Sequence, residues 1–146
     1  MPVIVVGADT DLGERLVARF GGQEREVRAF VTDPETVGRL RQGGAKVAVG
    51  DISDDTHLAG ACLGCFTAVL VMDADTDQRP RSFAVGSEAV LASWVEAVKA
   101  AKVQRVIWVG DSTPPVVPGC EVAVARATEA DVIDEVHRLD ELASLR

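Results

Sequence analysis

The chain has 146 residues, enough for one domain whose core needs neither disulfides nor a metal ion. It holds 23 Asp and Glu against 15 Lys and Arg, and the resulting net charge of −8 argues against nucleic acid or an anionic membrane as the main partner. Three cysteines are too few, and odd in number, for a disulfide framework, and no apolar stretch approaches the length of a membrane span. Met1-Pro2 leads directly into a predicted strand, not into a basic start and apolar leader. We therefore expect a single cytoplasmic domain over residues 1–146.

The first twenty residues predict a buried strand, a turn bounded by glycines and an amphipathic helix. An apolar run over 3–6 is followed by the loop Gly7-Ala8-Asp9-Thr10-Asp11-Leu12-Gly13 and then by a helical pattern to Phe20. The N-terminus of a helix placed in this way is suited to hold a phosphate. Three residues of the loop weigh against such a site. Thr10 stands where a middle glycine is expected, and Asp9 and Asp11 put two carboxylates beside the anion.

Strands and helices alternate through the rest of the chain. Strands are predicted at 3–6, 27–31, 46–49, 67–72, 105–109 and 121–125. Helices are predicted at 12–20, 34–42, 56–63, 82–102 and from 128 onward. Asp33 before Pro34 is typical of a helix start, and Thr128 is expected to cap the last helix with Asp131 three positions on. Apolar strands alternating with helices predict an α/β fold: a three-layer, doubly wound, Rossmann-like parallel sheet of five or six strands.

Aspartates follow nearly every predicted strand, and ligands of such sheets bind outside the carboxyl ends of the strands. The aspartates expected at this edge are Asp9, Asp11, Asp33, Asp51, Asp54, Asp73, Asp75, Asp77 and Asp111. Helix capping explains several of them individually. The alternation of Asp73, Asp75 and Asp77 would also suit Mg²⁺ or Ca²⁺, although we assign no metal ligands.

The predicted helix over 82–102 is apolar on most sides. Only a narrow stripe through Glu88, Glu96 and Lys99 is charged, so we expect the helix to be covered on two sides. The sheet would cover one side and a partner subunit the other. This interpretation predicts a homodimer formed through the helix around Trp94.

The chain resembles an atypical short-chain dehydrogenase/reductase of the NmrA-like kind. The resemblance rests on four stretches that cover roughly the first three quarters of the chain. They are Ile4 to Gly13, Val27-Arg28-Ala29-Phe30-Val31 with Asp33-Pro34-Glu35, Gly50-Asp51-Ile52-Ser53-Asp54, and Lys102-Val103-Gln104-Arg105-Val106-Ile107.

The resemblance implies an NAD(P)-binding site. Gly7, Thr10 and Gly13 would hold the pyrophosphate, Thr32 would lie where the family chooses between NAD and NADP, and Asp51 with Ile52 would contact adenine. Thr32 carries no positive charge, so NAD is favoured over NADP. Asp33 lies 20 residues after Gly13, the offset of a ribose-binding acid, but its place before Pro34 favours a helix cap. The candidate cofactor-binding residues are Gly7, Ala8, Asp9, Thr10, Asp11, Leu12, Gly13, Thr32, Asp33, Asp51, Ile52 and Asp73.

The chain departs from the family in its catalytic apparatus. Reductases of the family use a Tyr-x-x-x-Lys pair after the fifth strand, with a serine at the end of that strand. Ser112 would match the serine, but the sequence contains no tyrosine and no lysine beyond Lys102. We therefore assign no catalytic residues and expect hydride transfer by the family mechanism to be excluded.

The sequence favours a non-catalytic nucleotide sensor or regulatory subunit, with two alternatives. One is a cofactor-free interaction module that dimerises through the Trp94 helix, and the other is a nucleotide-binding regulatory domain of the potassium-transporter type. The remaining polar candidates have plain explanations. His57 and His137 are expected to be solvated, and the Cys62-Leu63-Gly64-Cys65 pair lacks the second pair that a zinc site would need.

Overall fold

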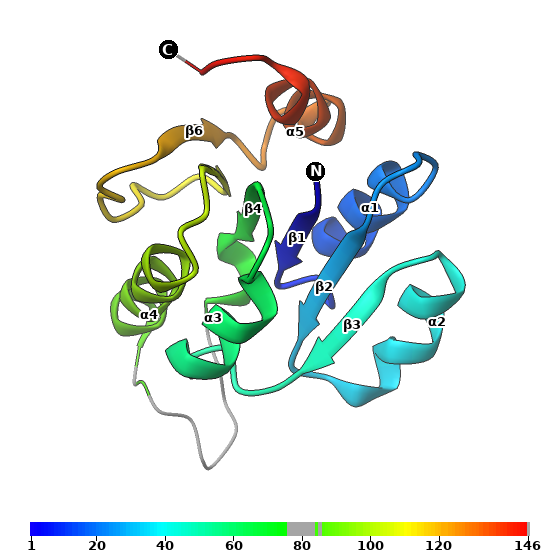
Figure 1. Ribbon diagram of the computed structural model, residues 1–146, viewed down its shortest axis with the longest axis horizontal. Helices are drawn as coiled ribbons and strands as arrows, with labels where there is room; N and C mark the ends of the chain where they lie inside the picture. Colours follow the sequence, from blue (N-terminus) through cyan, green and yellow to red (C-terminus); the bar gives the residue numbers. More distant parts are fainter. Residues whose placement is uncertain (76–83, 85, 146) are drawn as a thin grey trace.

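Six parallel strands form one sheet in the computed structural model, which describes residues 1–75, 84 and 86–145 (Figure 1). The strands are β1 (Val3–Val6), β2 (Val27–Val31), β3 (Lys46–Val49), β4 (Thr67–Val71), β5 (Arg105–Val109) and β6 (Glu121–Ala125). Their order across the sheet is β3-β2-β1-β4-β5-β6, and every neighbouring pair is parallel. The predicted three-layer α/β fold is confirmed, with six strands.

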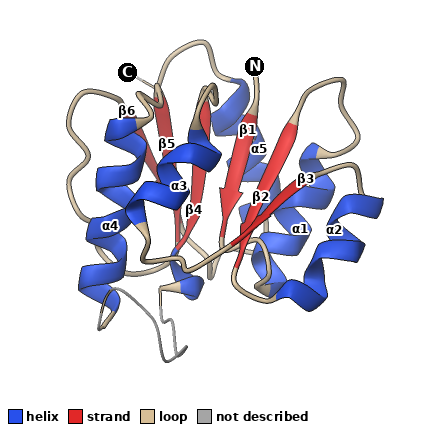
Figure 2. Ribbon diagram, turned by 60° about the horizontal axis from the view of Figure 1, so that its bottom comes forward, coloured by secondary structure: helices blue, strands red, loops and turns tan. Residues whose placement is uncertain are grey.

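Helices cover both faces of the sheet and bury two separate cores (Figure 2). One face packs against α1 (Asp11–Phe20), α2 (Val37–Gln42) and α5 (Val132–Glu141), and the other against α3 (Asp55–Cys62) and α4 (Ser87–Ala100). Two short 3₁₀ turns, η1 (Pro34–Thr36) and η2 (Met72–Ala74), follow β2 and β4. All residues of β1, β4 and β5 are buried, as expected for central strands of a parallel sheet.

The last helix begins later than its sequence predicts. Thr128 does not cap it, because α5 starts at Val132 and its N-cap residue is Asp131. The Thr128 hydroxyl instead donates to Asp111 Oδ1 at 3.1 Å. Asp111 follows β5, so this bond ties the end of β5 to the connection between β6 and α5. The Thr128 hydroxyl, predicted to cap the last helix, therefore binds the distant Asp111 carboxylate instead.

The helix α4 packs against the sheet and also against α3 of the same chain. The Trp94 side chain is completely buried, its indole N–H donates to the carbonyl oxygen of Ile52 at 2.7 Å, and its ring stacks on Trp108 with centroids 6.4 Å apart. Trp94 itself is therefore a core residue and not part of an exposed surface. The homodimer itself stays a prediction, but α4 gives it no support.

Polar side chains fasten α5 to the amino-terminal edge of the sheet. The fully buried Arg105 in β5 donates to the carbonyl oxygens of Leu139 and Asp140 at 3.0 and 2.7 Å, and pairs with Glu121 at 3.0 Å. His137, expected to be solvated, is only 7% exposed because α5 packs it against Phe20 of α1. His57 is exposed, as expected.

Because Trp94 makes an indole hydrogen bond and Trp108 makes none within the described part of the chain, the two residues should differ in their contribution to stability. The Nε1 atom of Trp108 is equally buried but has no hydrogen-bond partner among the described residues. Trp94→Phe would leave the Ile52 carbonyl oxygen without its hydrogen-bond donor. Trp108→Phe would remove only packing contacts. We expect Trp94→Phe to lower the free energy of unfolding by about 1–3 kcal/mol more than Trp108→Phe, measured by urea titration. Equal losses would contradict this role of the Ile52 bond.

Candidate functional site

The loop between β1 and α1 brings the helix unusually close to the strand before it. A Cβ atom on Gly13 would lie 2.1 Å from the carbonyl oxygen of Gly7 and 2.7 Å from Cα of Ala8. Gly7 has a φ of +81°, and a Cβ there would lie 2.6 Å from Cβ of Ala74. No other residue type fits at either position without moving backbone. The two glycines therefore fix where the N-terminus of α1 lies relative to the carboxyl end of β1.

Thr10, which replaces the expected middle glycine, is the cap of α1. Its hydroxyl accepts from the Gly13 N–H at 3.0 Å and donates to the Gly7 carbonyl at 2.8 Å. Asp11 does not cap this helix, since it is the first residue of α1 and is exposed. The N–H groups of Asp11 and Leu12 lie in the first turn, where a helix offers no carbonyl partner. These amides are the donors that an anion at this terminus would use.

Asp9 is directed toward the end of β2. Its Oδ2 atom accepts from the backbone N–H groups of Thr32 and Asp33, both at 2.9 Å. Two backbone donors thus stabilise the charge of Asp9, and of the two loop carboxylates only Asp11 remains exposed at the helix N-terminus. Sequence reasoning missed this role, because it placed both carboxylates against the phosphate. No local signal was available, because Asp9 and Thr32 are 23 residues apart in the sequence.

The residues predicted for the adenosine half lie at the ends of β2 and β3. Asp33 is exposed and accepts from the Glu35 N–H at 2.9 Å, which makes it the cap of η1. Asp51 accepts from the Ser53 N–H at 2.8 Å and from the Ser53 hydroxyl, and so orders the turn after β3. Ile52 is only 3% exposed, so its side chain belongs to the core and only its backbone is placed near this turn.

His57 lies at the same edge, and the sequence did not single it out for this place. Its ring packs edge-on against Phe30 with centroids 5.2 Å apart. A Cβ on Gly50 would lie 2.3 Å from its Nδ1 atom, so Gly50 gives the imidazole room to lie against the turn that follows β3. An exposed aromatic ring is therefore held beside the predicted adenine-binding segment.

Most aspartates of the carboxyl edge bind backbone or hydroxyl groups. Asp54 caps α3 by accepting from the His57 N–H, and Asp75 accepts from the Ser87 hydroxyl. Asp73 is exposed in η2, and Asp77 lies outside the described residues. Within the part of the chain that the structure describes, no group of three or more His, Cys, Asp or Glu side chains is placed to hold a metal ion.

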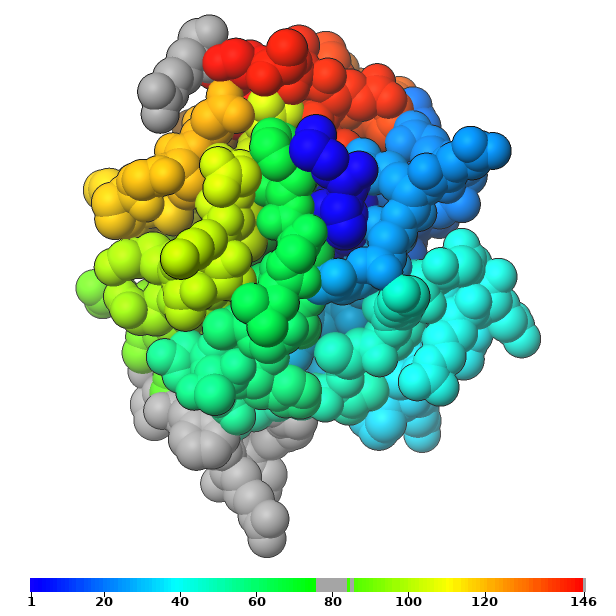
Figure 3. Space-filling view, in the orientation of Figure 1, coloured from blue at the N-terminus to red at the C-terminus, as the bar shows by residue number. Residues whose placement is uncertain are grey.

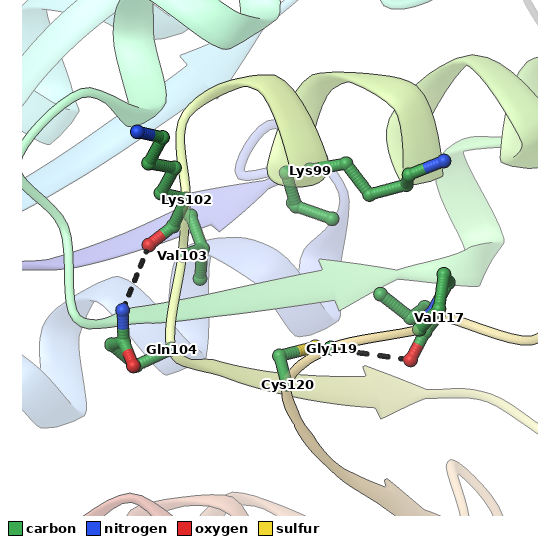
Figure 4. A pocket seen from close by; sticks show the side chains of 9 residues that line it. Lys99, Lys102, Val103, Gln104, Val117, Gly119 and Cys120 are labelled. Carbon is green, nitrogen blue, oxygen red and sulfur yellow. Dashed lines mark hydrogen bonds between the residues drawn. The ribbon is translucent and has the colours of Figure 1, made fainter.

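A pocket of about 380 Å³ opens at the carboxyl edge beside β4 and β5. Its lining includes Asp75, Ser87, Leu91 and the segment 112–115, so Ser112 lies in it. A second pocket, of about 280 Å³, is lined by Lys102, Gln104 and Cys120 (Figure 4). These residues precede β5 and β6, so this pocket lies at the opposite edge from the glycine loop. Only the first pocket is at the edge where ligands of parallel sheets bind.

The two cysteines of the Cys-x-x-Cys pair are buried free thiols. Burial raises the pKa of the Cys62 thiol to about 12, and burial also raises the pKa of Cys65. Both therefore remain protonated at neutral pH, which is the opposite of what a reactive thiolate requires. The pair is part of the core beneath α3.

The position of Asp9 predicts unequal effects for the two loop aspartates. Asp9→Ala removes two hydrogen bonds to a charged acceptor and should lower the free energy of unfolding by about 2–4 kcal/mol. Asp11→Ala removes only a favourable charge near the helix N-terminus and should cost about 0.3–1 kcal/mol. Denaturant titrations of both variants check this, and a smaller loss for Asp9→Ala than for Asp11→Ala would contradict the observed bonds.

Comparisons with known proteins agree with this geometry. Three similar solved structures are each at most 20% identical to the chain, so they show the fold alone. ChuY, an anaerobillin reductase from Escherichia coli O157:H7, has a TM-score of 0.68 at 16% identity, over 100% of this chain and 93% of its own. Serine dehydrogenase from Escherichia coli has a TM-score of 0.66 at 20% identity, over 98% and 92%. Triphenylmethane reductase from Citrobacter sp., complexed with NADP(H), has a TM-score of 0.61 at 20% identity, over 75% of this chain but only 37% of its own.

No curated protein sequence matches the chain. None of the described helices has the length and apolar character needed to cross a membrane. The sequence profile of the NAD(P)H-binding family matches residues 7–136, which include the glycine loop, all strands after β1 and part of α5. The chain therefore belongs to the NAD(P)H-binding family, and its expected partner is a nicotinamide dinucleotide.

Proposed function

We propose that the protein binds NAD(H) at the carboxyl edge of its sheet and acts as a non-catalytic dinucleotide sensor or regulatory subunit. The observation that carries the proposal is the loop Gly7–Gly13, in which two glycines and the Thr10 cap set the first amides of α1 at the strand end. The N–H groups of Asp11 and Leu12 would hold the pyrophosphate. The bound dinucleotide would be oxidised or reduced, and the protein would respond to that difference.

The two halves of the dinucleotide would extend in opposite directions from this loop. The adenosine would lie toward the ends of β2 and β3, near Thr32, Asp33 and Asp51. The nicotinamide would lie toward η2, with Asp73, and the pocket beside Ser112. This arrangement follows the rule that ligands of doubly wound sheets lie across the strand ends where the order reverses, which here is between β1 and β4.

The charges at the end of β2 favour NAD over NADP. Asp9 is bonded to the Thr32 and Asp33 amides, and Asp33 itself is exposed, so a 2′-phosphate would meet two carboxylates. Arg39 of α2 is held by Glu14, with 2.8 Å between Nη2 and Oε1. Like charges about 4 Å apart cost about 1 kcal/mol in water and about 4 kcal/mol near a protein surface. The NADP(H) named for triphenylmethane reductase describes that protein, and residues 32–35 of this chain, which follow β2, include no cationic side chain.

The sequence and the path of the chain after β5 both support a non-catalytic role. The chain contains no tyrosine, and an extended segment with prolines, not a helix, connects β5 to β6. A Tyr-x-x-x-Lys pair for proton transfer is therefore missing from this chain. Three free cysteines fit the reducing cytoplasm, where such a sensor would read the dinucleotide pool.

A second candidate is a reductase that passes a hydride from the dinucleotide to a substrate without a tyrosine proton donor. The pocket of about 380 Å³ at the carboxyl edge favours it, because Ser112 and the apolar Leu91 line a space beside the expected nicotinamide position. Steady oxidation of NADH with a quinone or dye acceptor, lost in Leu91→Trp, would support this candidate. Binding without turnover would support the sensor.

Ligand-induced stabilisation tests dinucleotide binding directly. At 100 times its dissociation constant, NADH should stabilise the native state by about 2.7 kcal/mol, which corresponds to a rise in Tm of about 5–10 °C for a chain of this size. NADPH at the same concentration should give a smaller shift, because its 2′-phosphate meets Asp9 and Asp33. Asp33→Asn should reduce the difference between the Tm shifts that NADH and NADPH give. Asp55→Asn should leave that difference unchanged, because Asp55 is an exposed residue in the first turn of α3. No shift with any nicotinamide dinucleotide would overturn the proposal.

Asp11 offers a second test, because its exposed carboxylate lies in the first turn of the helix that would hold the pyrophosphate. Asp11→Asn removes the like charge and leaves the backbone amides in place. The affinity for NADH should rise about fivefold, the equivalent of about 1 kcal/mol, and the gain should shrink as salt is raised. Isothermal titration calorimetry at low and high salt measures both effects. Unchanged affinity would mean that the pyrophosphate does not bind at this helix.

A further inference from the structure

The outer strand β6 carries two exposed valines, Val122 and Val124, whereas the opposite edge strand β3 carries one, Val49. The edge strand β3 begins with the exposed Lys46, whose ammonium pairs with Glu26 at 2.5 Å, and charged side chains of this kind protect strand edges from pairing. Residues 122–125 of β6 are Val-Ala-Val-Ala and contain neither a charge nor a proline. β6 also begins with a charged residue, Glu121, whose carboxylate accepts from the Leu145 N–H, but residues 122–125 present backbone N–H and C=O groups on the side away from β5 with no charged side chain among them.

One face of β6 is apolar and open to solvent. Ala123 and Ala125 belong to the core beneath α5, which leaves Val122 and Val124 on the opposite face, 40% and 42% exposed. The preceding segment adds Val116, at 85% the most exposed large apolar side chain among the described residues. Figure 3 shows β6 and the segment before it, coloured yellow to orange, at the surface of the molecule. An exposed strand edge beside exposed valines marks an interaction surface.

We propose that this edge is the interface of a homodimer, in which β6 pairs antiparallel with β6 of a second copy around a two-fold axis at Ala123. A two-fold axis makes the edge its own complement, since each copy donates and accepts the same backbone hydrogen bonds. Val122 then faces Val124 of the partner subunit on the open side of the sheet, and the reverse pair is made by symmetry. Two cross-strand pairs of valines are the type of contact that stabilises sheets.

The charge distribution along β6 allows a second copy as the occupant. Each chain carries a net charge of −8, so two copies repel unless they meet where acidic side chains are far apart. In the proposed register Glu121 lies opposite Ala125 of the partner subunit. The two Glu121 residues are then four residues apart along the strands, about 13 Å, which exceeds the Debye length of about 8–10 Å. In each copy, the Glu121 carboxylate also forms an ion pair with Arg105 of the same chain. An edge of five residues predicts a weak dimer, with dissociation in the micromolar to millimolar range.

The mass in solution tests the dimer. Sedimentation equilibrium should show wild-type protein passing from monomer to dimer between about 10 μM and 1 mM. Val124→Lys should shift the transition to at least tenfold higher concentration. Val49→Lys is the matched control, because Val49 is 38% exposed at the end of the other edge strand. A monomer at every concentration, a dimer insensitive to Val124→Lys, or a dimer lost in Val49→Lys would each overturn the proposal.

Cross-linking tests the register, because oxidation traps even a weakly populated dimer as a covalent product. In a Cys120→Ser background, Val122→Cys and Val124→Cys proteins are oxidised separately and as a mixture. Opposed residues lie about 4.5–5.5 Å apart between Cα atoms, within reach of a disulfide, whereas like residues lie diagonally at about 7–8 Å. The mixture should therefore give at least several times more covalent dimer than either protein alone. Equal yields, or none, would overturn the register. Neither experiment involves a nucleotide, so both are independent of the proposed function.

Discussion

The close contact between the start of α1 and the turn after β1 determines the geometry of the rest of the carboxyl edge. Gly13 touches the Gly7 carbonyl because neither residue carries a side chain in the way, and only then does the Thr10 hydroxyl reach both of them. The same turn directs Asp9 to the end of β2. One tight backbone contact thus sets a helix terminus, its cap and a link between two strands, and every ligand-binding role proposed for this edge depends on it.

The fold was predictable from the sequence because its signals are local. Buried strands appear as apolar runs and their ends as glycine or aspartate, and five of the six strands have the predicted bounds, while β4 ends one residue earlier, at Val71. The site was less predictable, because its contacts join distant segments. Nothing near Asp9 in the sequence shows that its carboxylate binds the Thr32 and Asp33 amides. In the same way, Thr128 is a good local cap, but the carboxylate of Asp111 binds it instead.

The apolar breadth of α4 shows that a hydrophobic pattern does not identify the neighbour that covers a helix. The pattern predicted two covered sides, and the helix does have two, but the second cover is α3 of the same chain. Periodicity reports that a side chain is buried and does not report what buries it. Trp94 is therefore a core residue held by a carbonyl of the β3–α3 connection. The surface that is open lies on β6, where two valines alternate with two alanines.

The link made by Asp9 has a consequence for communication within the molecule. The two amides that it binds directly precede η1 and α2, and α2 is a six-residue helix whose own buried residue is Leu40. A ligand that displaces the β1–α1 loop must either break both bonds or pull the start of η1 with it. The loop is therefore linked by hydrogen bonds to the segment that precedes η1, and α2, which follows η1, is the α-helix with the fewest buried residues. A displacement of the glycine loop on ligand binding would therefore shift the position of α2 and of its outer surface.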